Sequence, residues 1–432
     1  MNLSTLQTEP RHSLARFLAI NRTVAIVLVA VLFFGLGEEL WSSFMPVYLN
    51  ALSKEQKEQL HEGVAIGWVT LWTVGVYACL RNVFEGFCYI GGGQLTARLG
   101  DRGSLLLFAL LTISGYMLFL AVEAPWAAIL AALLILGWEP LSVPVTFTTV
   151  GSTVASGRHG MAFAVQSIQK RLPKVIGPFL AGCVLFFAQQ VTGSTTQGNI
   201  AGMRWLVAGA LALGLASLGI QLRWMPHHPA PPPGPSSLHI LRQLHPSLRR
   251  LLAAEVFTRW CDWLVREFVV LYIIVVRGVS VKTAGALIML QNLVALLTYL
   301  PIGRMTKTVG LQPFIGVTFI FFALFPLVLA IIPDGPWLWI AFVVYGLREI
   351  GEPARKAMIT SLMPEPIRAR GVGLYWGVRS FAICSASLVG AMIWFYFGPQ
   401  LLLYSAFGLG CIGAAVFYLF CRSPDDAVAQ PT

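Results

Sequence analysis

One apolar stretch of this sequence contains Glu255, Arg259, Asp262 and Arg266, at intervals of four, three and four residues. At about 100° per residue, these positions fall on one narrow face of a helix, where carboxylates and guanidinium groups can pair. Carboxylates can bind and release protons, whereas arginine stays protonated and can anchor an anion. The spacing therefore indicates proton transfer or anion binding inside an apolar environment.

A second apolar stretch contains Arg348, Glu352 and Arg355 on one predicted helix face, with Glu349 and Lys356 beside it. Arg355 and Lys356 lie near enough to the predicted helix end to extend into water. Arg348 lies nearer the middle of the stretch. We therefore expect Arg348 and Glu352 to be the stronger functional candidates.

Other apolar stretches contain Glu38 with Glu39, Glu139, the group Gln166, Lys170 and Lys174, Arg379, and the pair Arg81 and Glu85. A charged residue at the centre of a membrane helix costs about 2.5–3.5 kcal/mol, so these side chains should face the protein interior or water. The alternative is a set of buried ion pairs that only offset their own insertion cost. We favour that structural interpretation for Arg81 and Glu85, and leave both interpretations open for Lys170 and Arg379.

The composition indicates that these charged residues belong to a membrane protein. The chain has 432 residues, of which 56% are hydrophobic and 11% charged, and its mean hydropathy is +0.73. Soluble domains carry about 25% charged residues. The net charge of +11 comes from basic residues in short segments between apolar runs, which is typical of cytoplasmic membrane loops and not of nucleic-acid binding.

Apolar runs long enough to cross a membrane, about 20 residues each, predict an all-α membrane protein with twelve transmembrane helices in two pseudo-symmetric six-helix bundles. The runs lie at about 24–50, 63–92, 104–122, 126–150, 160–189, 201–224, 250–277, 281–306, 311–332, 335–362, 371–397 and 398–421. The predicted domains are residues 1–224, a proline-rich cytoplasmic linker at 225–249, and residues 250–432.

The loops and the repeats predict the orientation and the symmetry. Basic residues occupy alternate loops, which places both termini in the cytoplasm, in what we expect to be a bacterial inner (plasma) membrane. The segment 89–94 matches 299–304, and a similar match of 44–49 with 268–273 puts Glu38 opposite Asp262. Internal duplication is a feature of transporters, whose substrate sites lie between the repeats.

The segment that joins the second and third predicted helices resembles the loop motif of the major facilitator superfamily. Gly93, Arg98 and Gly100 match the glycines and the first arginine of that motif, whereas Ala97 replaces the usual aspartate; Asp101 and Arg102 complete the segment. The segment 177–182 also resembles part of the glycine-proline motif of the drug/proton antiporter branch. The resemblance implies a transporter fold whose first, fourth, seventh and tenth helices line a central cavity, and a gating role for the loop.

We hypothesise that the chain is a secondary transporter that works by proton-coupled alternating access. The expected proton carriers are Glu38, Asp262 and Glu139. The expected contacts to the solute or to the cavity wall are Arg266, Arg348, Glu352, Lys170, Arg379, Arg259 and Gln166.

The sequence leaves the solute open. The glycine-proline segment suggests efflux of amphipathic compounds. A matching aromatic wall could be built from Trp41, Trp138, Phe163, Trp260, Trp263 and Trp376, but we favour the alternative that these side chains pack helices together. The basic residues suit instead an organic anion, a phosphorylated metabolite or a metal chelate. A passive channel or a lipid scramblase is a further alternative.

The sequence also argues against several other functions. It contains no HExxH motif, no P-loop and no CxxC pair, so we expect neither an enzyme nor a metal site nor a cofactor. We also expect no removable signal peptide before the first apolar run. The expected partners are the solute, protons and membrane lipids, and we expect the chain to function as a monomer.

Overall fold

The computed structural model describes residues 22–58, 67–141, 159–224, 245–363 and 368–421, and these residues form helices without any β-strand. The helices before residue 225 are α2 (Arg22–Glu39), α3 (Met45–Glu58), α4 (Trp68–Ala121), α5 (Pro125–Leu136), α7 (His159–Thr192) and α8 (Thr195–Trp224). Those after residue 244 are α10 (Pro246–Leu271), α11 (Val281–Val309), α12 (Gln312–Ile331), α13 (Leu338–Leu347), α14 (Glu352–Ser361), α15 (Arg368–Ile383) and α16 (Ala386–Phe420).

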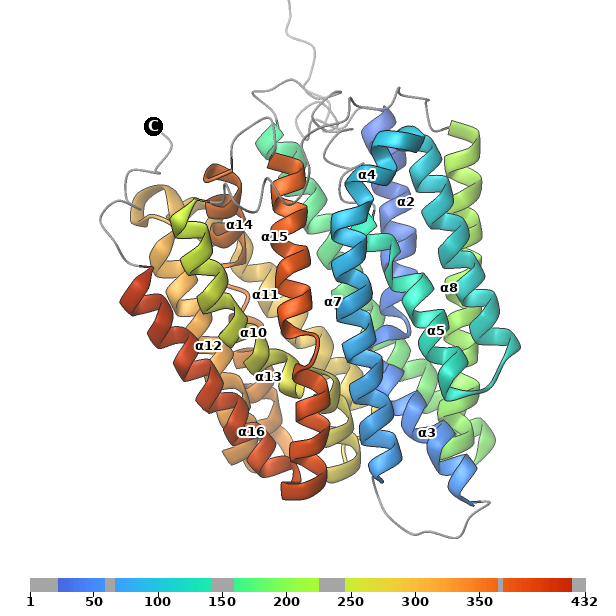
Figure 1. Ribbon diagram of the computed structural model, residues 1–432. Helices are drawn as coiled ribbons and strands as arrows, with labels where there is room; N and C mark the ends of the chain where they lie inside the picture. The colour runs from blue at the N-terminus through green and yellow to red at the C-terminus, as the bar shows by residue number, and fades with distance from the viewer. Residues whose placement is uncertain (1–21, 59–66, 142–158, 225–244, 364–367, 422–432) are drawn as a thin grey trace, which may run out of the picture.

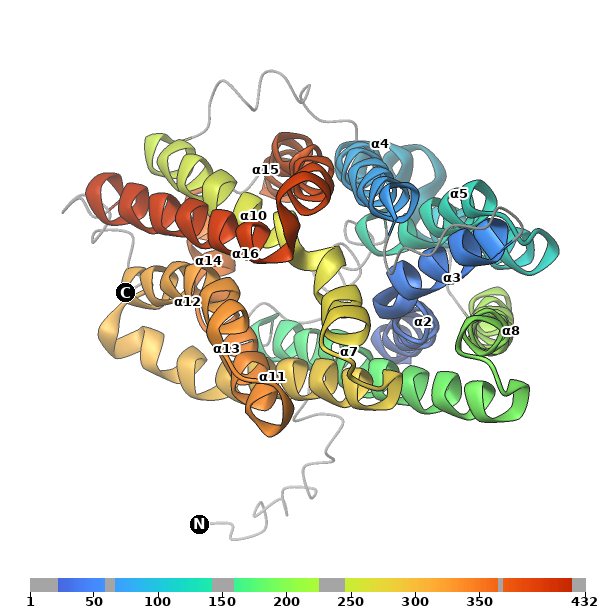
Figure 2. The same cartoon turned by 90° about the horizontal axis from the view of Figure 1, so that it is seen from below.

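The helices form two groups that follow the order of the chain. Figure 1 shows the helices before residue 225 on one side of the molecule and those after residue 244 on the other, and Figure 2 shows the same division from below. We call these groups the N-half and the C-half. Within the described residues, seven helical segments are long and apolar enough to cross a membrane, which confirms the predicted all-helical, apolar architecture.

Several predicted helices are interrupted near the charged residues. The first apolar run forms α2 and α3, with a 3-10 turn at Ser42–Phe44 between them, and the fourth run turns at Gly137 after α5. The second and third runs form one element, α4, which bends sharply at Gly100 (φ 69°). Positive φ is easily reached only by glycine.

The tenth apolar run is not one helix, because α13 ends at Leu347 and α14 begins at Glu352. Our expectation that Arg348, Glu352 and Arg355 share one face of a continuous helix is therefore wrong. The N–H of Gly351 donates a hydrogen bond of 2.6 Å to Thr318 Oγ1 of α12 instead of continuing the helix. Pro353 also disfavours a helical conformation in the residue before it.

Apolar packing joins the two halves at one end of the molecule. The largest core cluster includes Tyr48 and Phe119 of the N-half together with Phe268, Leu287 and Trp394 of the C-half. It lies at the end where α10 stops and α11 starts, which we call the distal end because residues 22 and 421 lie toward the other end (Figure 1).

Two further core clusters stay within single halves. One contains Phe314, Phe319 and Tyr375 of the C-half, and the other contains Phe34 and Phe108 of the N-half. A fourth, small cluster joins the halves again, where Ala78 of α4 packs with Trp263, Ile383 and Ala386 of the C-half. Most of the buried apolar residues that connect the halves nevertheless belong to the cluster at the distal end.

Candidate functional site

Two adjoining cavities, of about 190 and 180 Å³, lie where the two halves face each other. Six residues line both cavities, and we call them the neck. The neck consists of Glu38, Arg81, Arg171, Lys174, Arg266 and Glu349. Three of these side chains come from α2, α4 and α10, two come from α7, and Glu349 lies between α13 and α14. The cavities are thus built from helix segments that are distant in the sequence.

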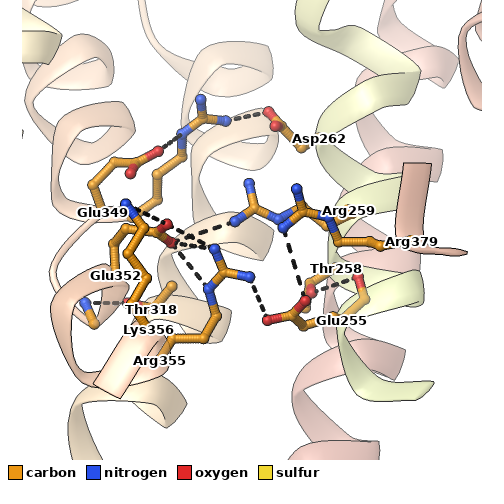
Figure 3. Close-up of polar contacts among 12 residues, drawn as sticks. Glu255, Thr258, Arg259, Asp262, Thr318, Glu349, Glu352, Arg355, Lys356 and Arg379 are labelled. Carbon is orange, nitrogen blue, oxygen red and sulfur yellow. Dashed lines mark hydrogen bonds and ion pairs between the residues drawn. The ribbon is translucent and has the colours of Figure 1, made fainter. Parts of the chain in front are cut away.

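The C-half contains a network of ion pairs, several members of which line the second cavity (Figure 3). Arg355 donates hydrogen bonds of 2.6 Å to both Glu255 and Glu352. Arg259 lies 3.6 Å from Glu352, and Arg379 lies 4.0 Å from Glu255. Removing one partner from such a buried network leaves an uncompensated charge. We therefore interpret Arg355 and its two carboxylates as a structural unit.

Asp262 and Arg348 form a second buried pair in the C-half. Arg348 donates a hydrogen bond to Asp262, and its guanidinium group stacks over Tyr345 with 3.9 Å to the ring centroid. The side chain of Arg348 is only 4% exposed. Asp262 and Arg348 therefore form a buried pair in which the carboxylate and the guanidinium group compensate each other's charge.

Two ion pairs cross from one half to the other. Arg171 of α7 donates a hydrogen bond of 2.6 Å to Glu349, which also accepts one of 3.4 Å from the Tyr299 hydroxyl. Arg81 of α4 lies 3.6 Å from Glu267 of α10. These contacts hold the facing halves together through charged groups.

The N-half side of the site contains Glu38, Glu39 and Glu139 near two lysines. The Lys174 ammonium lies 3.7 Å from Glu39 and 4.0 Å from Glu139, and Lys170 lies 3.9 Å from Glu139. Glu38 is 8% exposed, and its carboxylate has no hydrogen bond or ion pair among the residues that the structure describes. Glu38 is therefore a buried carboxylate that reaches the cavities without a bonded counter-charge.

The structure brings most of the predicted site residues together. Glu38, Glu139, Arg259, Arg266, Arg348, Glu352 and Arg379 line one or both of the two cavities. Asp262 lies behind Arg348 and Arg266. Lys170 lines a separate pocket of about 20 Å³. The side chain of Gln166 lies outside the described residues.

The predicted loop motif lies apart from the cavities. Gly100 forms the bend in α4, and Arg102 donates a hydrogen bond of 2.9 Å to the Leu222 carbonyl of α8. Arg98 is exposed. The side-chain positions of Gly93 and Asp101 are not among those described. The described positions of the motif therefore connect α4 to α8 within the N-half, and none of them lines either cavity.

Of the predicted aromatic wall, Trp263 alone lines either of the two large cavities. Trp41 and Trp138 are buried in the core. The Trp260 indole donates a hydrogen bond of 2.8 Å to the Ala382 carbonyl, and Trp376 packs edge-on against Tyr89. Phe163 lies outside the described side chains. The surface that faces the cavities is therefore mainly charged.

Sequence reasoning did not single out Arg171 and Glu267, each of which forms one of the two ion pairs between the halves among the described residues. Both are charged residues inside apolar stretches, the same signal that marked their neighbours Lys170 and Arg266. Their position on a helix does not reveal a partner that lies on another helix. Helical spacing did correctly indicate the i,i+4 pair of Arg81 and Glu85, whose hydrogen bond is 2.9 Å long.

Comparisons with known proteins agree with this architecture. Residues 251–432 match the family described as the Major Facilitator Superfamily, whereas the search of curated protein sequences returned no match.

Three solved structures resemble the whole chain. The human organic anion transporter MFSD10 (TETRAN) has a TM-score of 0.66 at 16% identity, covering 91% of this chain and 98% of that one. A D-xylose–proton symporter has a TM-score of 0.63 at 16% identity, covering 93% of this chain and 98% of that one. A POT family transporter in complex with a thioalcohol-conjugated peptide has a TM-score of 0.70 at 15% identity, covering 93% of this chain and 97% of that one. These proteins are transporters rather than enzymes, and at such identities the likeness shows the fold.

Proposed function

We propose that this chain, an integral membrane protein of the major facilitator superfamily, is a secondary transporter that moves a small charged solute by proton-coupled alternating access. The observation that carries the proposal is the pair of charged cavities between the two halves, with the buried carboxylate of Glu38 at their neck, which has no bonded partner in the part of the chain that the structure describes. Charged side chains in a membrane interior are costly and commonly mark a solute or proton path. The charge of the lining favours a polar solute over an amphipathic drug.

The helix count supports the same architecture. The bends of α4 at Gly100 and of α16 at Gly398 divide each of these elements into two segments. If α2 with α3, α13 with α14, and α15 with the first part of α16 each form one broken span, the chain has twelve spans. The two halves are then six-helix bundles, with the segment 225–244 between them. We expect a monomer to contain the complete site.

The described conformation corresponds to a transporter closed at its distal end. Helices α7 and α11 approach there so closely that a Cβ atom on Gly285 would lie 2.5 Å from the Pro178 carbonyl oxygen. The apolar cluster shared by both halves lies at the same end. The distribution of basic loops places this end outside the cell and both termini in the cytoplasm. The cavities would therefore exchange solute with the cytoplasm.

Glu38 is the side chain best suited to carry the coupling proton. The charged groups nearest to it are Glu39, Glu139, Lys174 and Arg81, on α2, the segment after α5, α7 and α4. A proton on Glu38 would remove its repulsion with the two neighbouring carboxylates. Rearrangement of the halves would change its distances to Lys174 and Arg81, and so change proton affinity between the two sides of the membrane. Asp262 would act differently, because Arg348 already neutralises it.

Transport by purified protein in liposomes tests this proposal. The panel contains organic anions, nucleosides, sugars, dipeptides and lipophilic cations, and accumulation is measured with and without an imposed pH gradient. We expect a small charged solute to accumulate only with the gradient. Glu38→Gln should abolish accumulation and leave exchange of solute between the two sides.

Glu123→Gln is the matched control. Glu123 lies between α4 and α5 and pairs with Arg204 of α8, and neither residue lines either cavity. This variant should accumulate solute like the unmodified protein. Undiminished accumulation by Glu38→Gln would refute the coupling role of this residue. Downhill flux that ignores the pH gradient would indicate a channel, and preferential uptake of lipophilic cations would indicate drug transport.

A further inference from the structure

The neck residues carry more positive than negative charge. Four of the six are basic and two are acidic, which leaves two uncompensated positive charges within this set. The Arg171 guanidinium is compensated by its 2.6 Å hydrogen bond to Glu349. Arg81 is compensated by Glu85 at 2.9 Å and by Glu267 at 3.6 Å. Lys174 and Arg266 are the two basic neck residues whose carboxylate partners among the described residues lie beyond hydrogen-bonding distance.

Lys174 and Arg266 differ from the tightly paired basic residues in contact and in exposure. Their ion pairs are 3.7–4.0 Å long, and neither makes a hydrogen bond among the described residues. Their side chains are 32% and 35% exposed, compared with 4% for Arg348. Donor groups that are charged, accessible and not hydrogen-bonded can bind an incoming anion without first breaking a strong bond.

The partner of Arg266 is already neutralised. Its nearest carboxylate oxygen is Asp262 Oδ2, at 3.7 Å, and the same carboxylate accepts a hydrogen bond from Arg348. The guanidinium group of Arg266 also stacks against Trp263, with 4.8 Å to the ring centroid. Stacking fixes the plane of the group and leaves its N–H edges available, a geometry suited to a planar carboxylate or a phosphate.

The two cations lie on opposite halves of the protein. Lys174 belongs to α7 of the N-half and Arg266 to α10 of the C-half, and both line both cavities. A solute with one anionic group can satisfy only one of them. A solute with an anionic group at each end can satisfy both, and it would then link the two halves during the conformational change.

We propose that the solute is a small organic dianion, such as a dicarboxylate or a phosphorylated carboxylate, that binds between Lys174 and Arg266. This inference rests on the proposed transport function. Glu38, Glu39 and Glu139 lie on the Lys174 side and oppose an anion there. When Glu38 binds a proton, the two carboxylates that stay charged, Glu39 and Glu139, are balanced by the two lysines of this side. The dianion and the proton therefore bind together and move in the same direction.

Binding to the purified full-length protein in detergent tests the inference. The probes are the dicarboxylates from malonate to adipate and 2-phosphoglycolate, with butyrate as a monoanion and putrescine as a dication. We expect at least one dianion to bind tenfold or more tightly than butyrate, and the dicarboxylates to bind more tightly at about pH 6.5, where both of their carboxyl groups are still mostly ionised, than at pH 8. The arms with dicarboxylates and with phosphoglycolate separate the two chemical sources of the second charge.

Variants assign the two anionic ends. Lys174→Gln and Arg266→Gln should each reduce the dianion's affinity to that of butyrate, and Arg266→Lys should restore part of it. Arg277→Gln is the matched control, because Arg277 bonds to Asp334 and to carbonyl groups at the distal end. It should retain the full preference. Melting temperatures of all variants identify any loss of folding.

The inference is overturned if no dianion of the series binds more tightly than butyrate. It is also overturned if both glutamine variants keep the preference. Gradient-driven accumulation of some other solute would then leave the proposed transport function standing. Conversely, a dianion that binds between the two cations but never accumulates against its gradient would refute transport and keep the binding site.

Discussion

Replacing Arg171 with glutamine removes one partner of the hydrogen-bonded ion pair that joins α7 to the segment between α13 and α14. The Arg171 and Glu349 side chains are 18% and 14% exposed, so water screens their interaction only weakly. A hydrogen bond between charged groups contributes about 1.5–3 kcal/mol. After the substitution, Glu349 keeps the Tyr299 hydroxyl at 3.4 Å and Arg348 at 3.9 Å, which compensates part of the loss.

We therefore expect Arg171→Gln to destabilise the described conformation, relative to one in which the halves have separated there, by about 2 kcal/mol. At 1.4 kcal/mol per tenfold change, this shifts the ratio of the two conformations by roughly 30-fold. Glu349→Gln should act in the same direction. The double variant should cost less than the sum of the single variants, because each substitution removes the same interaction.

The assay is double electron–electron resonance, which measures the distance between spin labels at Thr195 and Pro333. These are two exposed positions on opposite halves at the distal end. The assay reports the fraction of molecules in each conformation for the single and double variants. Arg277→Gln is the control, because its partner Asp334 belongs to the same half. Strictly additive effects of the two substitutions, or an equal shift in the control, would show that this pair does not hold the halves together.

Three further predictions concern other parts of the molecule. Arg355→Gln should lower the stability by about 3–5 kcal/mol, because it leaves two buried carboxylates without their partner; a melting temperature close to that of the unmodified protein would contradict this. Gly285→Val should disfavour the described conformation by about 1–3 kcal/mol through overpacking of α11 against α7, and the same spin-label distance should lengthen; an unchanged distance would count against closure at this end. Oxidation with copper phenanthroline should join Cys79 of α4 to Cys384, because the two thiols lie close enough to influence each other electrostatically; transport should stop until dithiothreitol restores it, and transport that continues through the linked protein would show that the halves need not separate along this seam.

Much of the fold is determined by local sequence. Long apolar runs require helices in lipid, because every backbone N–H and C=O must be satisfied within the segment. The charged residues inside these runs likewise had to face the protein interior, and most of the predicted ones do line the cavities. The sequence could also place each charge on a helix face, as the pair of Arg81 and Glu85 illustrates.

Only the tertiary structure decided which charges are paired. Glu38 and Asp262 were indistinguishable as predicted proton carriers, yet Asp262 is bonded to Arg348 whereas Glu38 has no bonded partner among the described residues. The break between α13 and α14 likewise depends on Thr318 of another helix. Helical spacing determines the direction in which a side chain points, but a hydrogen bond forms only within about 3 Å. That distance is set by the packing of helices from distant parts of the chain.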